Sequence, residues 1–191
     1  MEPQPFQRQR AFVTGRTDGA HIELRDGGES WSLAEPLLET VWPTEAMGSI
    51  AWGDLIFAEA DKRIFVWDES GLLVCHVGLF LREMRWDNHK VCVGGIGGVA
   101  TLPDFRECGF ASAALQCAAV HFTDAKLDFG LLFCEAREFA FYRKRGWRQF
   151  EGTVLMEQSA GHTRLTSMTP FLLDIRLSPR SGSLDLCGLP W

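Results

Sequence analysis

The stretch Val99-Ala-Thr-Leu-Pro-Asp-Phe-Arg-Glu-Cys-Gly-Phe-Ala-Ser-Ala-Ala-Leu115 runs from an apolar strand through a Pro-Asp turn into an Ala-rich helix. A turn that opens a helix in this way points several consecutive backbone N–H groups outward, at the positive end of the helix dipole. Gly109 lets the main chain approach a ligand closely, and Ala111 keeps the first helical turn slim. The stretch therefore predicts a binding site for a pyrophosphate. The six residues 106–111 alone also fit an ordinary strand–turn–helix whose helix packs through small side chains.

A second segment follows about thirty residues later. Phe129-Gly-Leu-Leu-Phe-Cys-Glu135 is typical of a buried strand, and residues 136–145 are typical of a helix. That helix ends in Tyr142-Arg-Lys-Arg-Gly146-Trp147, which has cations in the last turn and a glycine as the stop.

Together the two segments resemble the GNAT superfamily of N-acetyltransferases. Arg106-x-x-Gly109-x-Ala111 is similar to its acetyl-CoA pyrophosphate loop, and the strand, short helix and aromatic-Tyr-x-x-x-Gly-aromatic ending follow in the same order. The resemblance implies an α/β (α+β) fold, with a mixed, mostly antiparallel twisted sheet, a splayed parallel strand pair and flanking helices. It implies acetyl-CoA as co-substrate, no metal, and backbone contacts to the pantetheine arm from Val99, Ala100 and Thr101. The residues that it assigns to the pyrophosphate are Arg106, Glu107, Cys108, Gly109, Phe110 and Ala111.

Length and composition fit one domain over residues 1–191, with the first ~25 residues partly peripheral. The net charge of −6 argues against a nucleic-acid partner and leaves room for a cationic substrate. Six cysteines without a C-x-x-C pair, no signal peptide and no metal-ligand spacing indicate a reduced cytoplasm. The apolar runs are too short to span a membrane.

The remaining pattern predicts antiparallel strands joined to one β-α-β passage, which indicates a mixed sheet. Ser32 is the expected N-cap of an amphipathic helix that ends near Trp42. The expected strands lie at 21–24, 64–67, 72–81, 91–101, 147–150, 154–158 and 171–177, with a hairpin turn at 68–71 and a second turn at 88–90.

Gly95-Ile-Gly97-Gly98-Val-Ala100 fits G-x-G-x-x-A, the dinucleotide-binding fingerprint. That motif ends a strand and opens a helix, whereas these glycines precede a β-like Val-Ala-Thr and then Pro103. We therefore expect a bulged or side-chain-free strand that a ligand or another backbone approaches closely.

Tyr142 is the only tyrosine of the chain, and the resemblance places it beside the acetyl-CoA sulfur as proton donor to the leaving thiolate. The alternative is that Tyr142 only packs in the helix–strand seam. Glu135 stands where many superfamily members carry an Asn that contacts the pantetheine; it is that contact, a water-relayed base or an acid at the N-cap of the next helix. The other candidate bases are His76, His89, His121 and His162, of which we expect His121 to be structural.

The chain resembles the aminoglycoside 2′-N-acetyltransferases over most of its length. The matches are Gly98-Val-Ala-x-x-x-Asp104-Phe105-Arg106, the 136–147 segment, a late apolar strand with Asp174, and an ending at Trp191. In that family the carboxylate of the terminal Trp enters the acceptor site, where it binds an ammonium group and takes part in proton transfer. The resemblance thus makes Trp191 both a catalytic and a substrate-binding candidate, although a terminal Trp is by itself more often incidental.

The departures concern the acids of the acceptor site. Gly97, before Gly98, replaces an expected glutamate, and Leu189 replaces an expected aspartate. Glu45 is the candidate for an early acidic ligand, and His162 and Arg164 stand in a loop where acids are expected. Fewer acids and an added cation favour an acceptor with few ammonium groups and a carboxylate. Kasugamycin fits that description, with Arg164 as the partner of its carboxylate.

Three alternatives stay open. A Gly-rich strand after Cys75-His-Val-Gly-Leu-Phe-Leu-Arg82 also resembles the nodulation acyltransferases, which lack a counterpart of the 137–147 ending. A GNAT domain that binds acyl-CoA without turnover is a second alternative, and a protein-lysine acetyltransferase is the third. From the family we expect a homodimer, an antibiotic-resistance role, and no nucleic-acid or membrane partner.

Overall fold

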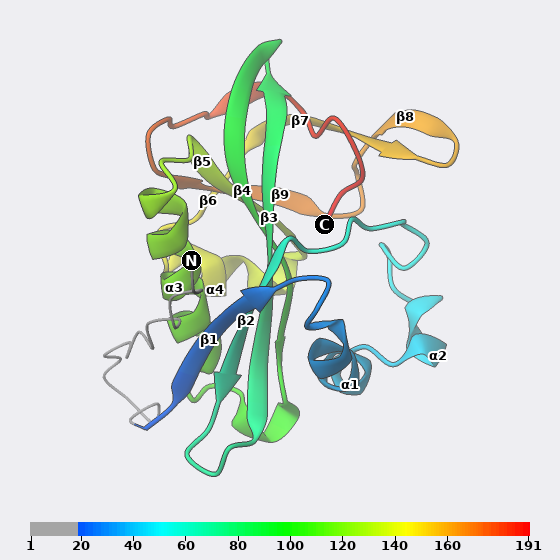
Figure 1. Ribbon diagram of the computed structural model, residues 1–191. Helices are drawn as coiled ribbons and strands as arrows, with labels where there is room; N and C mark the ends of the chain where they lie inside the picture. Colours follow the sequence, from blue (N-terminus) through cyan, green and yellow to red (C-terminus); the bar gives the residue numbers. More distant parts are fainter. Residues whose placement is uncertain (1–18) are drawn as a thin grey trace, which may run out of the picture.

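The computed structural model describes residues 19–191, so most of the expected peripheral segment lies outside the described residues. Within them, ten strands form one sheet in which β1 to β4 make an antiparallel meander (Figure 1). The strands are β1 (His21–Asp26), β2 (Lys62–Trp67), β3 (Leu73–Trp86), β4 (His89–Thr101), β5 (Phe129–Cys134), β6 (Arg148–Gln149), β7 (Glu151–Gln158), β8 (Gly161–Arg164), β9 (Thr169–Asp174) and β10 (Ser181–Asp185).

The turn between β2 and β3 forms where the sequence predicts it. Asp68 Oδ1 accepts hydrogen bonds from the backbone N–H groups of Ser70 and Leu72, both at 2.9 Å. This Asx-type turn closes the hairpin, because a short acidic side chain satisfies N–H groups that the strands cannot reach. The second turn was expected at 88–90 but lies at Asp87 and Asn88, both with positive φ, because His89 and Lys90 already pair with β3 in β4.

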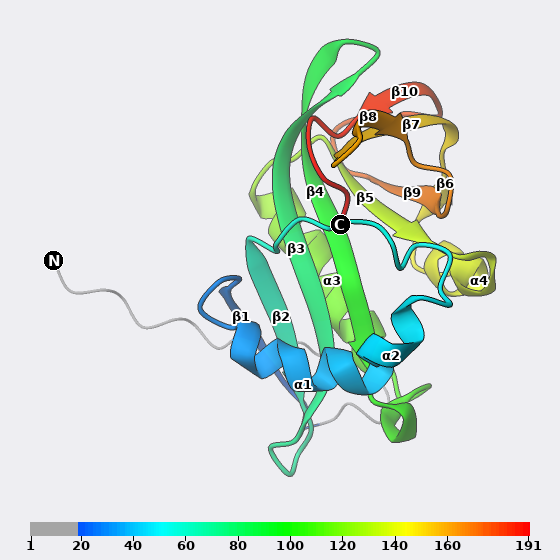
Figure 2. The same cartoon turned by 90° about the vertical axis from the view of Figure 1, so that its right-hand side faces the viewer.

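Helices cover both faces of the meander. α1 (Trp31–Val41) and α2 (Thr44–Met47) lie on one side of the sheet, and α3 (Phe110–Asp124) lies on the other (Figure 2). The remaining short helices are η1 (Pro103–Phe105), η2 (Ala136–Glu138) and α4 (Phe139–Arg143). None of the helices in the described part of the chain has the length and apolarity needed to cross a membrane.

α3 is the crossover of the predicted β-α-β passage. β4 and β5 are parallel and pair from Val93↔Phe129 to Ile96↔Leu132. The fully buried side chains of Ala114, Ala118 and Phe122 on α3 pack against the sheet in the first hydrophobic core. The predicted mixed α/β sheet is thereby confirmed.

The C-terminal third curls the sheet on itself. β9 pairs with β5 on one side, while β10 pairs with β3 and, in parallel, with β7 on the other. β6, at one end of the strand order, and β7, next to last at the other end, are joined through the buried Phe150, which brings the two sides of the sheet together (Figure 2). Inward-facing residues fill this curl as a second core that includes Met84, Leu131 and Leu184.

Several expectations about element boundaries are wrong, among them the strand expected at 171–177, which instead runs from Thr169 to Asp174. The first helix has Ser30 at its N-cap rather than Ser32, because the buried Ser30 hydroxyl donates back to the Asp26 carbonyl and fixes the turn there. The expected 136–145 helix is broken into η2 and α4, which ends at Arg143. His162 and Arg164 lie on strand β8 rather than in a loop, and β10 was not expected at all.

Candidate active site

The candidate site begins where β4 and β5 separate. Their pairing stops at Ile96↔Leu132, and in the described residues β5 continues with β9 alone while β4 continues with β3. Figure 2 shows the two strands diverging, β4 toward the start of α3 and β5 toward α4. Val99, Ala100 and Thr101 lie on the part of β4 that has left β5, so their backbone groups on that edge are not used by the sheet.

Directly after this stretch the chain forms the expected turn before α3. Gly109 is the N-cap residue with φ +92°, and Glu107 also has a positive φ, of +61°. Within residues 19–191, no carbonyl or side chain accepts a hydrogen bond from the N–H groups of 107–112. Six free N–H groups at the positive end of a 15-residue helix make a site for an anion.

α4 follows β5 and places Tyr142 in the first hydrophobic core, beside Phe110 and Ala114 of α3. Its ring is 6% exposed and packs edge-on against Phe141 and Trp147, with centroids 5.1 and 6.4 Å away. Burial, followed by the nearby Cys134 thiol and Glu138 carboxylate, raises the pKa of the Tyr142 phenol well above its ordinary value. The phenol therefore keeps its proton at any working pH and is available as a hydrogen-bond donor.

Arg145 ties α4 to the first turn of α3. Its Nε donates to Ser112 Oγ at 3.0 Å, and Nη2 contacts the same hydroxyl. Nη1 donates to the Phe141 carbonyl at 2.6 Å, and the guanidinium lies 3.6 Å over the Phe141 ring. The anion-binding turn and the buried phenol are thus held in one arrangement.

Glu135 ends β5 and occupies the N-cap position of η2. The Glu138 carboxylate accepts the Glu135 N–H at 2.8 Å, so Glu135 takes part in the cap of η2. Its roles as a pantetheine contact or a water-relayed base stay predictions. Oε1 of Glu135 accepts the indole N–H of Trp52 at 3.0 Å, and Oε2 lies 3.2 Å from Nε of Arg137. The carboxylate thereby joins β5 to the segment between α2 and β2.

Trp191 packs against the glycines of β4. A Cβ built at Gly95 would lie 2.4 Å from Cε2 of Trp191, so only glycine admits the indole. The indole stacks on Phe80 at 5.5 Å, and the guanidinium of Arg82 lies 5.3 Å from its centre. Trp191 therefore closes the end of the second core that faces the strand separation.

Comparison with known proteins agrees with this geometry. The family model described as "Acetyltransferase (GNAT) domain" matches residues 29–150, well over half of the chain. The chain belongs to the GNAT acetyltransferase family. Curated proteins gave no match.

Solved structures show the GNAT fold at low sequence identity. A conserved protein of Enterococcus faecalis V583 is 18% identical with a TM-score of 0.54, over 69% of this chain and 33% of that protein. The GNAT family N-acetyltransferase YhbS of Escherichia coli, in complex with CoA, is 11% identical with a TM-score of 0.59, over 97% and 93%. A GNAT family acetyltransferase from Brucella melitensis, in complex with acetyl-CoA, is 11% identical with a TM-score of 0.54, over 86% and 94%. The chain thus spans a third of the Enterococcus protein and nearly all of the other two.

The remaining residues predicted for the GNAT acceptor site are not all together. Gly97 and Gly98 lie on β4, and a Cβ at Gly97 would lie 3.0 Å from the backbone carbonyl carbon of Trp191. Any side chain at position 97 would therefore press against Trp191 and Phe80. Glu45 is exposed on α2.

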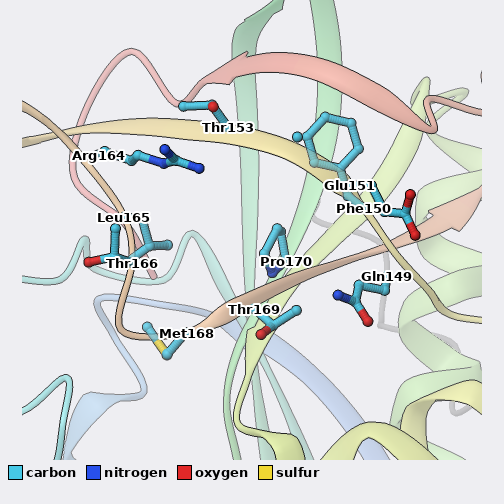
Figure 3. Close-up of a pocket in the computed structure, with 11 residues that line it drawn as sticks. Gln149, Phe150, Glu151, Thr153, Arg164, Leu165, Thr166, Met168, Thr169 and Pro170 are labelled. Atoms are coloured by element: carbon cyan, nitrogen blue, oxygen red, sulfur yellow. The ribbon is translucent and has the colours of Figure 1, made fainter.

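Arg164 lines a separate, open hollow of about 570 Å³ between β7 and β9 (Figure 3). Thr153 and Pro170 line it from the two sides, and its lining includes none of Gly97, Gly98 and Trp191. The roles of Glu45 and Arg164 toward an acceptor stay predictions.

Two contacts of this GNAT site were missed from the sequence. Trp52 reaches Glu135 across 83 positions, and Arg82 reaches the Leu189 carbonyl at 2.6 Å across 107. No local sequence pattern predicts either pair, because each contact forms only when distant segments of the chain fold together. The one available signal was Arg82 itself, a cation at the end of the mostly apolar run 72–81.

Proposed function

We propose that this GNAT chain is an acetyl-CoA-dependent N-acetyltransferase that acetylates an amino group of an aminoglycoside, with the 2′-amine of kasugamycin favoured. The observation that carries the proposal is the anion-binding turn, with its free N–H groups at 107–112, next to the strand separation and held to the buried Tyr142 by Arg145. We further propose that the chain is a single domain, acts as a homodimer in the cytoplasm, and confers resistance.

The turn would hold the diphosphate of acetyl-CoA. The N–H groups of 107–112 donate to its oxygens, and the α3 dipole favours the negative charge. Val99, Ala100 and Thr101 would bind the pantetheine arm through their backbone, as a strand would. Such fixed positions turn the transfer into an effectively unimolecular reaction.

The chemistry would then be direct transfer. The neutral amine attacks the thioester carbonyl, an N–C bond forms, and the C–S bond breaks. Tyr142 donates its proton to the departing thiolate, and the acceptor nitrogen loses its proton to water held near Glu135. The Tyr142 phenolate then regains a proton from solvent, so no net proton is gained or lost.

The acceptor assignment is supported by the resemblance and by the lack of an acid at positions 97 and 189, where the resembled family carries one. Trp52, with Trp42 and Phe57 packed edge-on at 6.0 and 5.8 Å, forms a partly exposed aromatic cluster beside Glu135. One carboxylate beside aromatic faces fits an acceptor with few ammonium groups. Arg164 remains our candidate for the carboxylate of kasugamycin.

The test is coenzyme A release from acetyl-CoA with kasugamycin, gentamicin, kanamycin or a lysine peptide as acceptor, with mass spectrometry of each product. We expect turnover with kasugamycin and transfer of one acetyl group to its 2′-amine. Turnover only with the other drugs or the peptide would overturn the acceptor, and saturable acetyl-CoA binding without any transfer would favour a non-catalytic domain. Arg164→Glu should weaken kasugamycin binding but leave acetyl-CoA binding unchanged.

A further inference from the structure

The register of β3 and β4 contains a break next to the proposed pantetheine contacts. The strands pair one to one up to Gly78↔Gly97, and pairing resumes at His76↔Ala100. Gly98 and Val99 therefore stand opposite a single residue, Val77, which defines a β-bulge. Gly98 has φ +56°, a conformation that L side chains seldom adopt.

A buried side chain contacts the bulge from β3. His76 is 1% exposed, and its Nδ1 lies 2.8 Å from the Gly98 carbonyl oxygen. Its Nε2 lies 3.1 Å from Nη1 of Arg63, which is 6% exposed. Nε of Arg63 in turn donates to the Gly27 carbonyl at 3.1 Å.

These contacts determine the tautomer of His76. A guanidinium has only donors, so Nε2 must accept from Arg63. Nδ1 then carries the ring proton and donates it to the Gly98 carbonyl. Burial, with Arg63 as a further cause, lowers the pKa of His76 to about 4, which agrees with a neutral ring.

The bulge controls where the next residues point. A β-bulge bends its strand and increases the local twist. The residues that follow it are Val99, Ala100 and Thr101, the proposed backbone partners of acetyl-CoA. The Gly98 carbonyl is thus the point at which a buried hydrogen bond sets the direction of the binding edge.

We propose that His76 is a positioning residue for acetyl-CoA: its Nδ1–H holds the Gly98 carbonyl, and thereby fixes the bulge that orients residues 99–101. The proposal rests on the proposed function, since it assumes that this edge binds acetyl-CoA. Arg63 supports the ring from behind and sets its tautomer.

Two substitutions of His76 test the contacts of its two ring nitrogens separately. His76→Asn keeps an N–H donor near the position of Nδ1, and His76→Gln extends toward Arg63 but lacks a donor at Gly98. Val77→Ala is the matched control, because it removes buried volume opposite the bulge without touching Gly98. For each protein we would measure kcat, KM for acetyl-CoA, Tm, and hydrogen exchange of the 98–101 amides without ligand.

We expect His76→Gln to raise the KM for acetyl-CoA about tenfold, the effect of one lost buried hydrogen bond. The exchange of the 98–101 amides should accelerate to a similar degree, and His76→Asn should recover most of both losses. Val77→Ala should lower Tm and leave KM unchanged. Equal KM increases in His76→Gln and Val77→Ala, or no recovery in His76→Asn, would overturn the proposal.

The exchange data also separate this proposal from the proposed function. If the wild type does not bind acetyl-CoA, the proposed function fails, while unchanged exchange in His76→Gln overturns control of the bulge by His76. If neither His76 variant folds, the ¹⁵N shifts of the wild-type ring decide. A proton on Nδ1 is expected, and a proton on Nε2 would overturn the proposal.

Discussion

At Tyr142, burial among aromatic rings does two things at once. It removes the phenol from water, which raises its pKa, and it fixes the ring between α4 and β9 through Trp147 and Phe171. In the described part of the chain, the hydroxyl donates to no protein acceptor. The phenol is thus fixed, protonated and unpartnered. Because its raised pKa makes it a weaker acid, donation to a thiolate requires the sulfur to lie in direct contact with it.

Tyr142→Phe should therefore lower kcat about 100-fold, within the usual range for loss of a general acid. KM for acetyl-CoA should change less than about twofold, because the ring and its packing remain. Steady-state kinetics with saturating acceptor measure both constants. Trp147→Phe is the packing control and should affect Tm more than kcat; full turnover in Tyr142→Phe would show that the phenol only packs.

A site residue could be predicted when the residues that determine its place are close to it in the sequence. Gly109 and Tyr142 belong to local strand–turn–helix patterns, so their places could be predicted from neighbouring residues. Trp52 and Arg82 act on Glu135 and on the 189–191 segment, far along the chain, and only the folded sheet brings them there.

At the scale of single elements, β4 explains the G-x-G-x-x-A pattern without a dinucleotide. A Cβ at Gly94 would lie 2.5 Å from Phe122 on one face, and one at Gly95 would lie 2.4 Å from Trp191 on the other. Gly98 supplies the positive φ of the bulge. The expected bulged strand is confirmed: packing requires glycine at Gly95 and at the neighbouring Gly94, and the backbone conformation requires it at Gly98.

Gly95→Ala should destabilise the protein by about 1–3 kcal/mol, because the added methyl group overlaps the Trp191 indole in a packed core. Gly48→Ala is the matched control: it has helical φ and no atom within 4 Å of the new Cβ. It should change stability by less than about 0.5 kcal/mol. Urea denaturation measures both, and equal effects would contradict the placement of Trp191 against β4.

Element boundaries were predictable where the apolar pattern is long and unpredictable where it is short. β3, β4 and α3 carry sustained buried patterns. β8 is exposed at all four residues, and β10 is five residues long with one buried side chain, so neither has a readable period. The 136–145 helix breaks because the Glu135 and Glu138 pair caps a separate short turn.

On the scale of the whole molecule, the sheet has two halves. The meander of β1 to β4 carries α1 and α3, and the curl of β3 to β10 encloses the second core. The candidate site lies where β4 leaves β5 between these halves. β4 therefore contributes both to the packing of the two cores and to the geometry of the site. The buried His76–Arg63 pair contacts β4 at the Gly98 carbonyl.

The whole fold should lose stability in acid because of His76. Its pKa falls from 6.5 to about 4 on folding, so the unfolded chain binds the proton more readily. The loss of stability begins as the pH falls below 6.5 and is complete below the folded pKa of about 4. Over this range the free energy of unfolding should drop by about 3 kcal/mol. The charged neighbour on β2 is Arg63, and Glu59 acts on Arg63 in turn.

Urea denaturation at pH 7 and pH 4 measures this drop. His76→Asn is the control, because it has no titrating group at that position and shares all other acid-sensitive carboxylates. The acid loss should be smaller in the variant by the stated amount. The same loss in both proteins would show that His76 does not carry it.

The central claim is that the turn before α3 binds the diphosphate of acetyl-CoA, and calorimetric titration of acetyl-CoA tests it most directly. The wild type and Gly48→Ala should bind at one saturable site with equal affinity. Gly109→Ala should bind about tenfold more weakly, because the φ of +92° at the N-cap costs about 1–2 kcal/mol in any residue with a Cβ. Equal binding by all three proteins, or no saturable binding by the wild type, would contradict the account.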